Sequence, residues 1–460
     1  LPPARQRVAQ RRAVLERMER VSALPVPAPT PGHAPGTSAV LATSAPEGRL
    51  VSTTRARGMG IFLGVLAVVM AWPFGLSVGA KVRTTFLMGA APALNVSPIT
   101  MPVRWVSFGL ALGCLALSAF LVAQPRGRGR YLIFGLGVVL FIWSLLAWAA
   151  RNQDLNFVQL LAETLGSTTP LVYGSLSGIL CERSGVVNIA IEGQFLAGAF
   201  LGAMIGSATN VLWLGVVAGA LAGGIFGALL AFLTLRYGGD QIIIGVVIVA
   251  FCTGLTNYLT EQVLTPDQAT LNTGGTFSPV GIPLLDKIPI AGPVLFYQNV
   301  FVYGAAILLV VVHVGLFFTR WGLRTRAVGE HPRAAETVGI HVLAVRYRNV
   351  ILGGIVAGIG GASFTIGSIG EFSAGMTAGL GYVALAAMIF GRWRPFGALG
   401  AALLFGFVVS LQSFLQVLNV GIPSAFLSMA PYVITILVVC GLVGRVRAPA
   451  ADGVPYRREG

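Results

Sequence analysis

One polar stretch within otherwise apolar sequence holds the residue types best suited to bind a polar solute. Between Cys181 and Gln194 (CERSGVVNIAIEGQ), charged and amide residues interrupt two apolar runs. An acid in apolar surroundings is costly, so Glu192 is the best candidate for a functional carboxylate. Asn188 and Gln194 lie beside it and offer amide donors and acceptors. Two other interpretations of Glu192 stay open: it pairs with Arg183, or it caps the helix that follows.

Motifs for nucleotide hydrolysis, metal binding and nucleophilic catalysis are missing from the sequence. It has no G-x-x-x-x-G-K-[ST] loop, so it does not bind ATP as P-loop proteins do. It also has no H-E-x-x-H motif, no G-x-S-x-G motif and no cluster of carboxylates. The cysteines lack C-x-x-C spacing and the histidines are dispersed: Cys114, Cys181, Cys252, Cys440, His33, His313, His331 and His341. We therefore predict no catalytic residue, no metal site and no cofactor in this chain.

The composition is typical of a helical membrane protein. Of the 460 residues, 55% are hydrophobic and 10% are charged, whereas soluble domains carry about a quarter charged residues. Mean hydropathy is +0.81. Apolar runs of about 20 residues suit helices that cross the hydrocarbon core, and the alternation typical of a β-barrel is absent. The 60 glycines, including Gly353, Gly354, Gly358, Gly360 and Gly361, favour close helix packing. We predict an all-α polytopic membrane protein.

Hydropathy and charge together predict about 12 transmembrane helices, with both termini in the cytoplasm. The expected spans are 58–79, 104–123, 131–149, 158–180, 186–207, 211–236, 241–264, 300–319, 348–370, 379–391, 396–417 and 427–444. The net charge is +15, and arginines gather in the loops at 124–130 and 320–348 and after residue 444. The positive-inside rule places these segments in the cytoplasm, so the basic charge indicates membrane topology and no nucleic-acid partner. Loop 80–103, with Lys81 and Arg83 outside, is an exception.

The chain divides into four predicted regions. Residues 1–57 form a basic, Pro-rich cytoplasmic tail that is expected to be disordered, and it precedes the first apolar run. Residues 58–157 hold extra N-terminal transmembrane helices, residues 158–444 form the main core, and residues 445–460 form a second cytoplasmic tail. Within the core, the stretch 181–194 is either a cytoplasmic turn or a broken helix that lines a cavity.

The longest internal cytoplasmic loop is Arg320–Arg348, and it is strongly basic. Pro332 is suited to the first position of a short helix, which we expect over Arg333–Val338. A short amphipathic helix that faces the cytoplasm presents a surface to a partner protein. The alternative is an ordinary basic loop without a partner.

Four stretches of the core carry a resemblance to a known family. Gly322–Ile340 (GLRTRAVGEHPRAAETVGI) resembles the coupling loop of permease subunits of bacterial ABC importers, in the branch of branched-chain amino acid, ribose and nucleoside permeases. Pro170–Gly193, Phe372–Pro395 and Gly397–Phe407 resemble further blocks of the nucleoside and simple-sugar permeases. The resemblance is collinear over about 158–444. The N-terminal third adds segments that it does not cover.

The resemblance implies a permease subunit in the bacterial plasma membrane that works within a larger importer. The implied partners are cytoplasmic ATPase subunits, which bind ATP and Mg²⁺, and an extracellular substrate-binding lipoprotein or periplasmic protein. A second permease, homologous or identical to this chain, is also implied, and the resemblance favours a heterodimer. Membrane lipid surrounds the chain. The resemblance places a set of coupling-loop residues at the ATPase contact: Arg326, Gly329, Glu330, Pro332, Arg333 and Ala335.

A nucleoside has ribose hydroxyls and base edges, which suit hydrogen bonds from Asn188, Glu192 and Gln194. Three aromatic side chains are candidates to stack on a base: Phe364, Phe372 and Tyr382. Packing against lipid or core is the alternative for all three.

Two other function classes compete with the importer. An ion-gradient-driven secondary transporter or channel for a small polar solute is expected to carry relays of buried acids and histidines, which are few here. A membrane-embedded transferase needs clustered carboxylates or a nucleophile, which the sequence lacks.

Overall fold

The computed structural model describes residues 47–89, 97–124, 129–441 and 447–456. The chain divides into two compact units, residues 1–54 and residues 55–460, and the description below concerns the second. Most of the predicted N-terminal tail therefore lies outside the described residues. The described part is predominantly helical, with a few short strands that the all-α prediction did not include.

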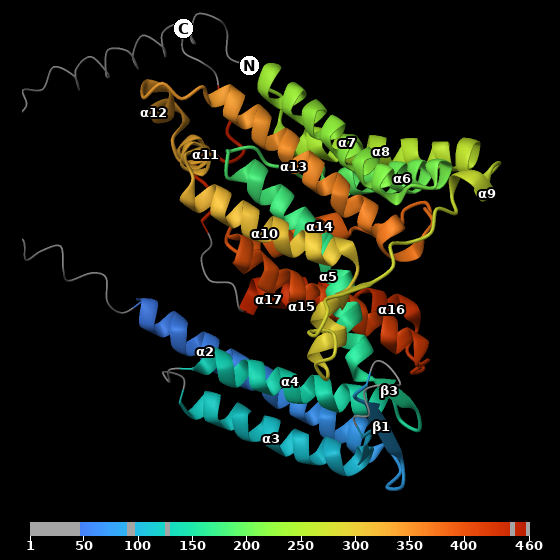
Figure 1. Cartoon of the computed structure of the whole chain (residues 1–460). Coiled ribbons are helices and arrows are strands. Elements are labelled where there is room, and N and C mark those ends of the chain that lie inside the picture. The colour runs from blue at the N-terminus through green and yellow to red at the C-terminus, as the bar shows by residue number, and fades with distance from the viewer. Residues whose placement is uncertain (1–46, 90–96, 125–128, 442–446, 457–460) are drawn as a thin grey trace, which may run out of the picture. The chain divides into compact units, whose positions relative to one another are not determined.

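The first group of helices contains α2 (Glu47–Ala71), α3 (Val103–Ala123) and α4 (Arg130–Ala149), which lie side by side (Figure 1). Their contacts include polar ones, because the Ser118 hydroxyl donates to the Gly60 carbonyl at 2.7 Å. Strands β1 (Arg83–Leu87), β2 (Ile99–Pro102) and β3 (Asp154–Asn156) form a small sheet in the order β2-β1-β3. The predicted loop at 80–103 thus contains sheet structure, with β1 antiparallel to β2 and parallel to β3.

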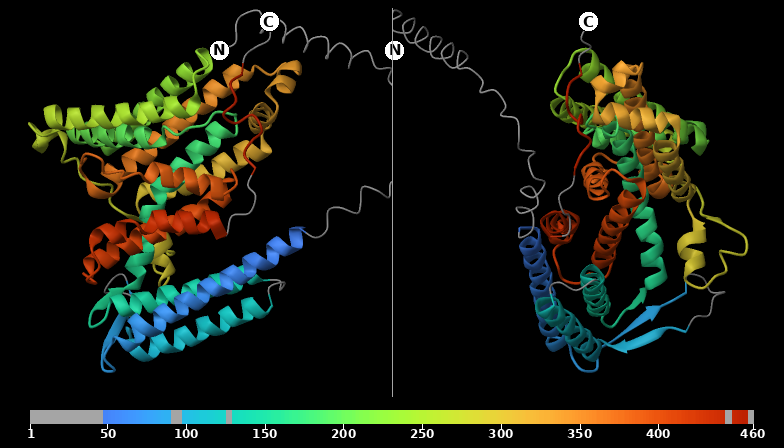
Figure 2. Two further views of the ribbon diagram at one scale, coloured as in Figure 1. Left: turned by 180° about the vertical axis from the view of Figure 1, so that it is seen from behind. Right: turned by 90° about the vertical axis from the view of Figure 1, so that its left-hand side faces the viewer.

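The remaining helices form the core around α5. Their bounds are α5 (Phe157–Glu182), α6 (Ile191–Thr209), α7 (Leu212–Ala231), α8 (Gln241–Leu259), α9 (Gln268–Leu271), α10 (Val300–Phe318), α11 (Arg320–Glu330), α12 (Pro332–Thr337), α13 (Val342–Phe364), α14 (Leu380–Phe390), α15 (Pro395–Val417), α16 (Ser424–Ser428) and α17 (Ala430–Gly441). Strands β4 (Val280–Gly281) and β5 (Tyr297–Gln298) pair in the loop before α10. Figure 2 shows α5 running from the α2–α4 group into this core.

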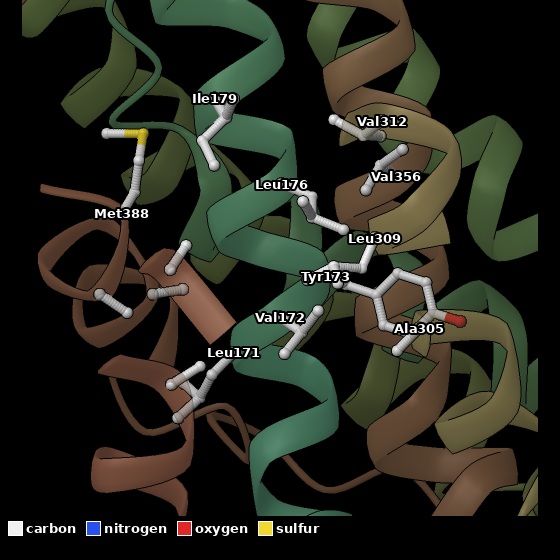
Figure 3. Close-up of a cluster of buried hydrophobic side chains, with 14 of the residues drawn as sticks. Leu171, Val172, Tyr173, Leu176, Ile179, Ala305, Leu309, Val312, Val356 and Met388 are labelled. Carbon is white, nitrogen blue, oxygen red and sulfur yellow. The ribbon is translucent and has the colours of Figure 1, made fainter. Parts of the chain in front are cut away.

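The side chains of α5 form the centre of the largest apolar cluster. Leu171, Leu176 and Ile179 are fully buried, and Figure 3 shows them facing side chains of α10, α13 and α14. Tyr173 adds a polar contact, because its hydroxyl donates to the Phe301 carbonyl at 3.1 Å. This packing holds the helices that surround the candidate site.

Helices α6, α7 and α13 approach one another through glycines. A Cβ added at Gly358 would lie 2.1 Å from the Gly219 carbonyl oxygen, and one at Gly223 would lie 2.2 Å from the Gly354 carbonyl oxygen. Only residues without a side chain allow this approach. The prediction that Gly354 and Gly358 serve helix packing is confirmed.

Within the described ranges, nine helices are long and apolar enough to cross a membrane. They coincide with nine of the expected spans; the others correspond to α5, α14 and α17. At 1.5 Å per residue, the 11 residues of α14 extend only about 16 Å, which is about half the hydrocarbon thickness. The prediction of 12 spans therefore remains a prediction, as does the orientation of the termini.

Candidate functional site

The polar stretch predicted as a candidate site is an irregular connection between α5 and α6. Residues 183–190 are not helical, and Gly185 takes a φ of +87°, which suits glycine. The chain then folds back along α5, because Asn188 contacts Ser177 and Cys181. A Cβ at Gly174 would lie 3.3 Å from Ile191, the first residue of α6. Helix α6 therefore begins beside α5 about eight residues before α5 ends. Whether this connection is a cytoplasmic turn or a broken helix that lines a cavity stays a prediction.

Asn188 and Gln194 are brought together by this fold. The Asn188 Nδ2 group donates to Gln194 Oε1 at 3.1 Å and to the Ser177 hydroxyl at 3.4 Å. Both amide residues are fully buried. Asn188 Oδ1 and Gln194 Nε2 have no hydrogen-bond partner among the described residues. Buried polar atoms are usually paired, so these two unpaired atoms are exceptions within the packed interior.

The contacts of Glu192 differ from both alternatives, which were pairing with Arg183 and capping the helix that follows. Its Oε1 accepts hydrogen bonds from the Thr377 hydroxyl at 2.6 Å and the Gly379 amide at 2.8 Å, and its Oε2 accepts from the Gly381 amide at 2.6 Å. The carboxylate lies in the first turn of α6 and binds the first turn of α14. The positive ends of both helix dipoles favour a negative charge there.

Arg183 does not pair with Glu192 and binds a turn between α14 and α15 instead. Its Nε donates to the Trp393 carbonyl at 3.1 Å. The backbone of this turn is unusual, because Arg392 and Trp393 both have positive φ, at 57° and 53°. Side chains disfavour that conformation, so the turn is held by its contacts.

The three candidate aromatic residues lie at different points around α6. Phe364 packs edge-on against Phe195, with ring centroids 5.6 Å apart, and Phe372 packs edge-on against Phe200 at 5.3 Å. The Phe372 amide also donates to Asn272 Oδ1 at 2.7 Å. Tyr382 is 43% exposed and lies on α14, one residue beyond the Glu192 contact. The structure thus brings Tyr382 near Glu192, and it uses Phe364 and Phe372 in packing.

The basic loop forms two helices, α11 and α12. Pro332 occupies the first turn of α12, so the predicted short helix is confirmed with bounds Pro332–Thr337. Ala335 is buried in a cluster with Val328 and Val342. Gly329 is also buried, and a Cβ there would lie 2.2 Å from the Arg183 carbonyl oxygen. These two residues anchor the loop on the core and are not free to touch a partner.

The outer face of α11 and α12 holds other residues of the predicted coupling set. Arg333 is exposed, and Arg326 is half-buried with its guanidinium 5.2 Å from the centre of the Phe317 ring. Two apolar residues outside the predicted coupling set are also exposed, Leu323 at 62% and Val338 at 75%. An apolar side chain beside arginines on a short, anchored helix is suited to docking a protein.

The described part of the C-terminal tail, Arg447–Tyr456, is packed on this same region. The Ala451 amide donates to the Gly329 carbonyl at 2.8 Å, and the Ala450 amide donates to Glu330 Oε2 at 3.2 Å. The Arg346 side chain, which is fully buried, donates to the Ala451 and Val454 carbonyls. The sequence analysis did not predict this site; its signals were Arg346, close before the predicted span 348–370, and Asp452, an acid in a basic tail.

No group of three or more His, Cys, Asp or Glu side chains is placed to hold a metal ion in the ranges that the structure describes. A cavity of about 300 Å³ is lined by Tyr173, Trp213, Phe277, Phe301 and other mostly apolar residues of α7, α10 and α13. None of the predicted solute contacts lines it. Because its wall is apolar and aromatic, we assign no polar solute to it.

Comparison with known proteins connects this geometry to transport. Residues 160–441 match the family described as "Branched-chain amino acid transport system / permease component". The nucleoside ABC transporter permease protein NupC of Lactococcus lactis subsp. cremoris is 39% identical over 313 residues, which cover 65% of this chain and 98% of that protein. The guanosine ABC transporter permease protein NupQ of Bacillus subtilis is 38% identical over 317 residues, covering 66% and 98%.

A more distant relative is the putative glucose ABC transporter permease protein TsgC13 of Haloferax volcanii. It is 32% identical over 323 residues, which cover 65% of this chain and 98% of that protein. No solved structure matches the chain significantly. The family match begins within α5, so α2, α3 and α4 precede it.

Proposed function

The chain belongs to the family of permease components of branched-chain amino acid transport systems, and we propose that it forms part of the pathway of a nucleoside importer. As a member of this family it is a multi-pass plasma-membrane protein and a permease subunit of an ABC importer, without an ATP-binding site of its own. One observation carries the nucleoside assignment: similarity to permeases named for nucleosides and guanosine extends over 98% of their length.

Such a permease works with ATPase subunits and a substrate-binding protein. In our proposal, two cytoplasmic ATPase subunits bind ATP and Mg²⁺, and an extracellular lipoprotein delivers the solute. The second permease is homologous to this chain and forms a heterodimer with it. Both termini and the α11–α12 pair face the cytoplasm, in agreement with the arginines of that loop.

The proposed solute contacts are the amides of Asn188 and Gln194. Their unpaired Oδ1 and Nε2 atoms supply one acceptor and one donor, which match a ribose hydroxyl or a base edge. Both residues are closed off in this conformation, so the solute reaches them only when the surrounding helices move. Glu192 and Tyr382 lie at the contact between α6 and α14, which is the contact proposed to open.

The aromatic contacts are the second part of the proposed pathway. Phe364 and Phe372 each pack on α6 in the closed conformation. Movement of α6 away from either ring exposes a face on which a base can stack. Alternating access of this kind is a rigid-body change of packed helices.

The proposed ATPase contact, called the docking face below, comprises three exposed residues: Leu323 of α11, Arg333 of α12, and Val338, which directly follows α12. Gly329 and Ala335 hold this face on the core, and Pro332 begins the docking helix. A push on α12 therefore reaches α13 directly, and it reaches the turn after α5 through Gly329 of α11. Arg326 and Glu330 act as supports, since one packs on Phe317 and the other binds Ala450.

The test is uptake of labelled guanosine, adenosine, uridine and ribose by cells that lack this gene. Cells are complemented with the wild-type chain, with Arg333→Glu, or with Arg394→Glu as the matched control. Both arginines are exposed, and only Arg333 lies on the docking face. We expect nucleoside uptake to return with the wild type and the control, and to stay low with an inserted Arg333→Glu chain.

Other outcomes contradict separate parts of the proposal. If ribose uptake alone depends on the gene, the importer stands and the nucleoside assignment is wrong. If uptake survives deletion of the ATPase and collapses with a protonophore, the chain is an ion-gradient-driven transporter. Equal uptake with Arg333→Glu and Arg394→Glu rejects the docking face.

A further inference from the structure

The C-terminal segment Arg447–Tyr456, called the C-terminal strap below, contacts α11, α12, α13 and the end of α5. Its amides bind α11 at Gly329 and Glu330, as described above. At its end, the Tyr456 hydroxyl donates to the Glu336 carboxylate of α12. The Tyr456 ring also packs on the apolar cluster that contains Ala335. The strap thus holds both helices of the docking face (Figure 2).

The strap also contacts residues near the ends of two core helices, α13 and α5. Arg346 of α13 donates to the Val454 carbonyl at 3.1 Å, to the Ala451 carbonyl at 3.4 Å and to the Ser184 carbonyl at 3.1 Å. Asp452 lies beside Glu182, the last residue of α5, and the two carboxyl groups share a hydrogen bond when one of them carries a proton. A buried guanidinium needs such partners, and the strap supplies two of its three carbonyl acceptors.

The network continues to the turn before α15. Glu182 Oε2 accepts a hydrogen bond from Trp393 Nε1 at 2.6 Å, and Arg183 binds the Trp393 carbonyl. Trp393 follows α14, whose other end is bound by Glu192. A continuous set of contacts therefore runs from α12, through the strap and Glu182, to the helix beside the proposed pathway.

We propose that the C-terminal strap is a coupling element, which transmits the movement of α11–α12 to α5, α13 and α14. This inference rests on the proposed function. In this role Asp452, Arg346 and Tyr456 are positioning residues, and they touch neither solute nor ATP. The strap stays attached to α12 through the transport cycle, so that the two move as one body.

The test uses the complete importer, reconstituted in liposomes with its ATPase subunits, its second permease and its binding protein. Guanosine uptake and ATP hydrolysis are measured together for the wild type and for chains ending at residue 447 or at residue 456. The chain ending at 456 keeps every described strap contact and is the control. For the shorter chain, we expect uptake per ATP hydrolysed to fall about fivefold or more, as for loss of coupling between two sites.

A second pair of variants separates coupling from folding. In Glu336→Cys/Tyr456→Cys, the hydrogen bond between the strap and α12 is lost. A short bis-maleimide then joins the two cysteines covalently and so reattaches the strap to α12. We expect low coupling before the reagent and recovery after it, while the single variant Tyr456→Cys shows no recovery. A folding defect would not be repaired by the link. If the shorter chain does not assemble, this pair decides the question.

The results that overturn the inference differ from those that overturn the function. Equal uptake per ATP for the chains ending at 447 and 456 rejects the strap while the importer stands. Loss of uptake when the reagent links positions 336 and 456 rejects permanent attachment and with it this proposal. If no ATPase copurifies with the wild-type chain and no guanosine enters, the proposed function fails first.

Discussion

The Gly381 amide of α14 donates a hydrogen bond of 2.6 Å to the Glu192 carboxylate of α6, across 189 residues of sequence. The same carboxylate accepts from Thr377 and from Gly379, the residue that precedes α14. Gly379 has a φ of +79°, so it turns the chain into the helix with its amide toward Glu192. The Glu192 carboxylate therefore joins the beginning of α6 to the beginning of α14, beside the two amides proposed to bind solute.

The first prediction concerns the stability that Glu192 provides. Glu192→Ala leaves three donors without their acceptor, and each buried donor left unpaired costs about 1–3 kcal/mol. We expect a clear fall in the melting temperature of the purified chain, and a smaller fall for Glu192→Gln, which keeps one oxygen. Glu371→Gln, at an exposed acid of the neighbouring loop, is the control. An unchanged melting temperature for Glu192→Ala would show that its hydrogen bonds contribute little.

This relationship also shows what the sequence was able to predict. Glu192 was recognisable as costly in apolar surroundings, because that judgement needs only its neighbours in sequence. Its partners were not, because Thr377, Gly379 and Gly381 reach it through tertiary structure. For the same reason, the helix at Pro332 was predicted almost to its ends, whereas the contact between Ala450 and Glu330, 120 residues apart, was missed.

The bounds of apolar helices were readable from the sequence, because the predicted element 379–391 appears as α14 over Leu380–Phe390. Its contact with Glu192 through the Gly379 amide was not readable, because it depends on tertiary structure. Part of the expected cytoplasmic tail packs on the core as the C-terminal strap, because the buried Arg346 side chain donates hydrogen bonds to the Ala451 and Val454 carbonyls. In contrast, the glycines of α13 were interpreted correctly, since small residues in an apolar helix have few other roles.

The second prediction tests the glycine contacts of α13. A methyl group at Gly358 would overlap the Gly219 carbonyl oxygen, so Gly358→Ala is expected to destabilise the chain by about 1–3 kcal/mol, as overpacking does. Gly254→Ala is the matched control, because it lies inside α8 with nothing within 4 Å of the added carbon. Thermal unfolding of both variants in detergent gives the measurement. Equal melting temperatures would mean that α7 and α13 separate at little cost.

The third prediction distinguishes solute binding from packing at the paired amides. Asn188→Leu/Gln194→Leu removes the hydrogen bond between them together with the two unpaired atoms, so the cost in stability is expected to be small. We expect the KM for guanosine to rise tenfold or more, about 1.4 kcal/mol of binding, with little change in melting temperature.

The matched control for the paired amides is Ser144→Ala. It removes an unpaired buried hydroxyl from α4, outside the family match. Its KM should equal that of the wild type. A lower melting temperature and an unchanged KM in the double variant would assign Asn188 and Gln194 to packing alone.

The fourth prediction concerns pH and the strap. Burial raises the pKa of Asp452 from its ordinary value of 3.8 to about 6, while the hydrogen bond with Glu182 and the charge of Arg346 oppose the rise. A carboxyl whose pKa is raised by docking binds its proton more tightly in the docked state. Its contribution to docking is therefore complete below about pH 4 and is lost as the pH rises through about 6.

Asp452→Asn removes this titration and keeps a side chain of the same shape. Hydrogen exchange of residues 448–456 is compared between wild type and variant at each pH, so that the intrinsic exchange rate cancels. We expect similar protection at pH 4 and greater protection of the variant above pH 6, where the wild type must bury a charged Asp452 opposite Glu182. Greater protection of the wild type at pH 7.5 would show that attraction to Arg346 outweighs burial, and would reverse the predicted sign.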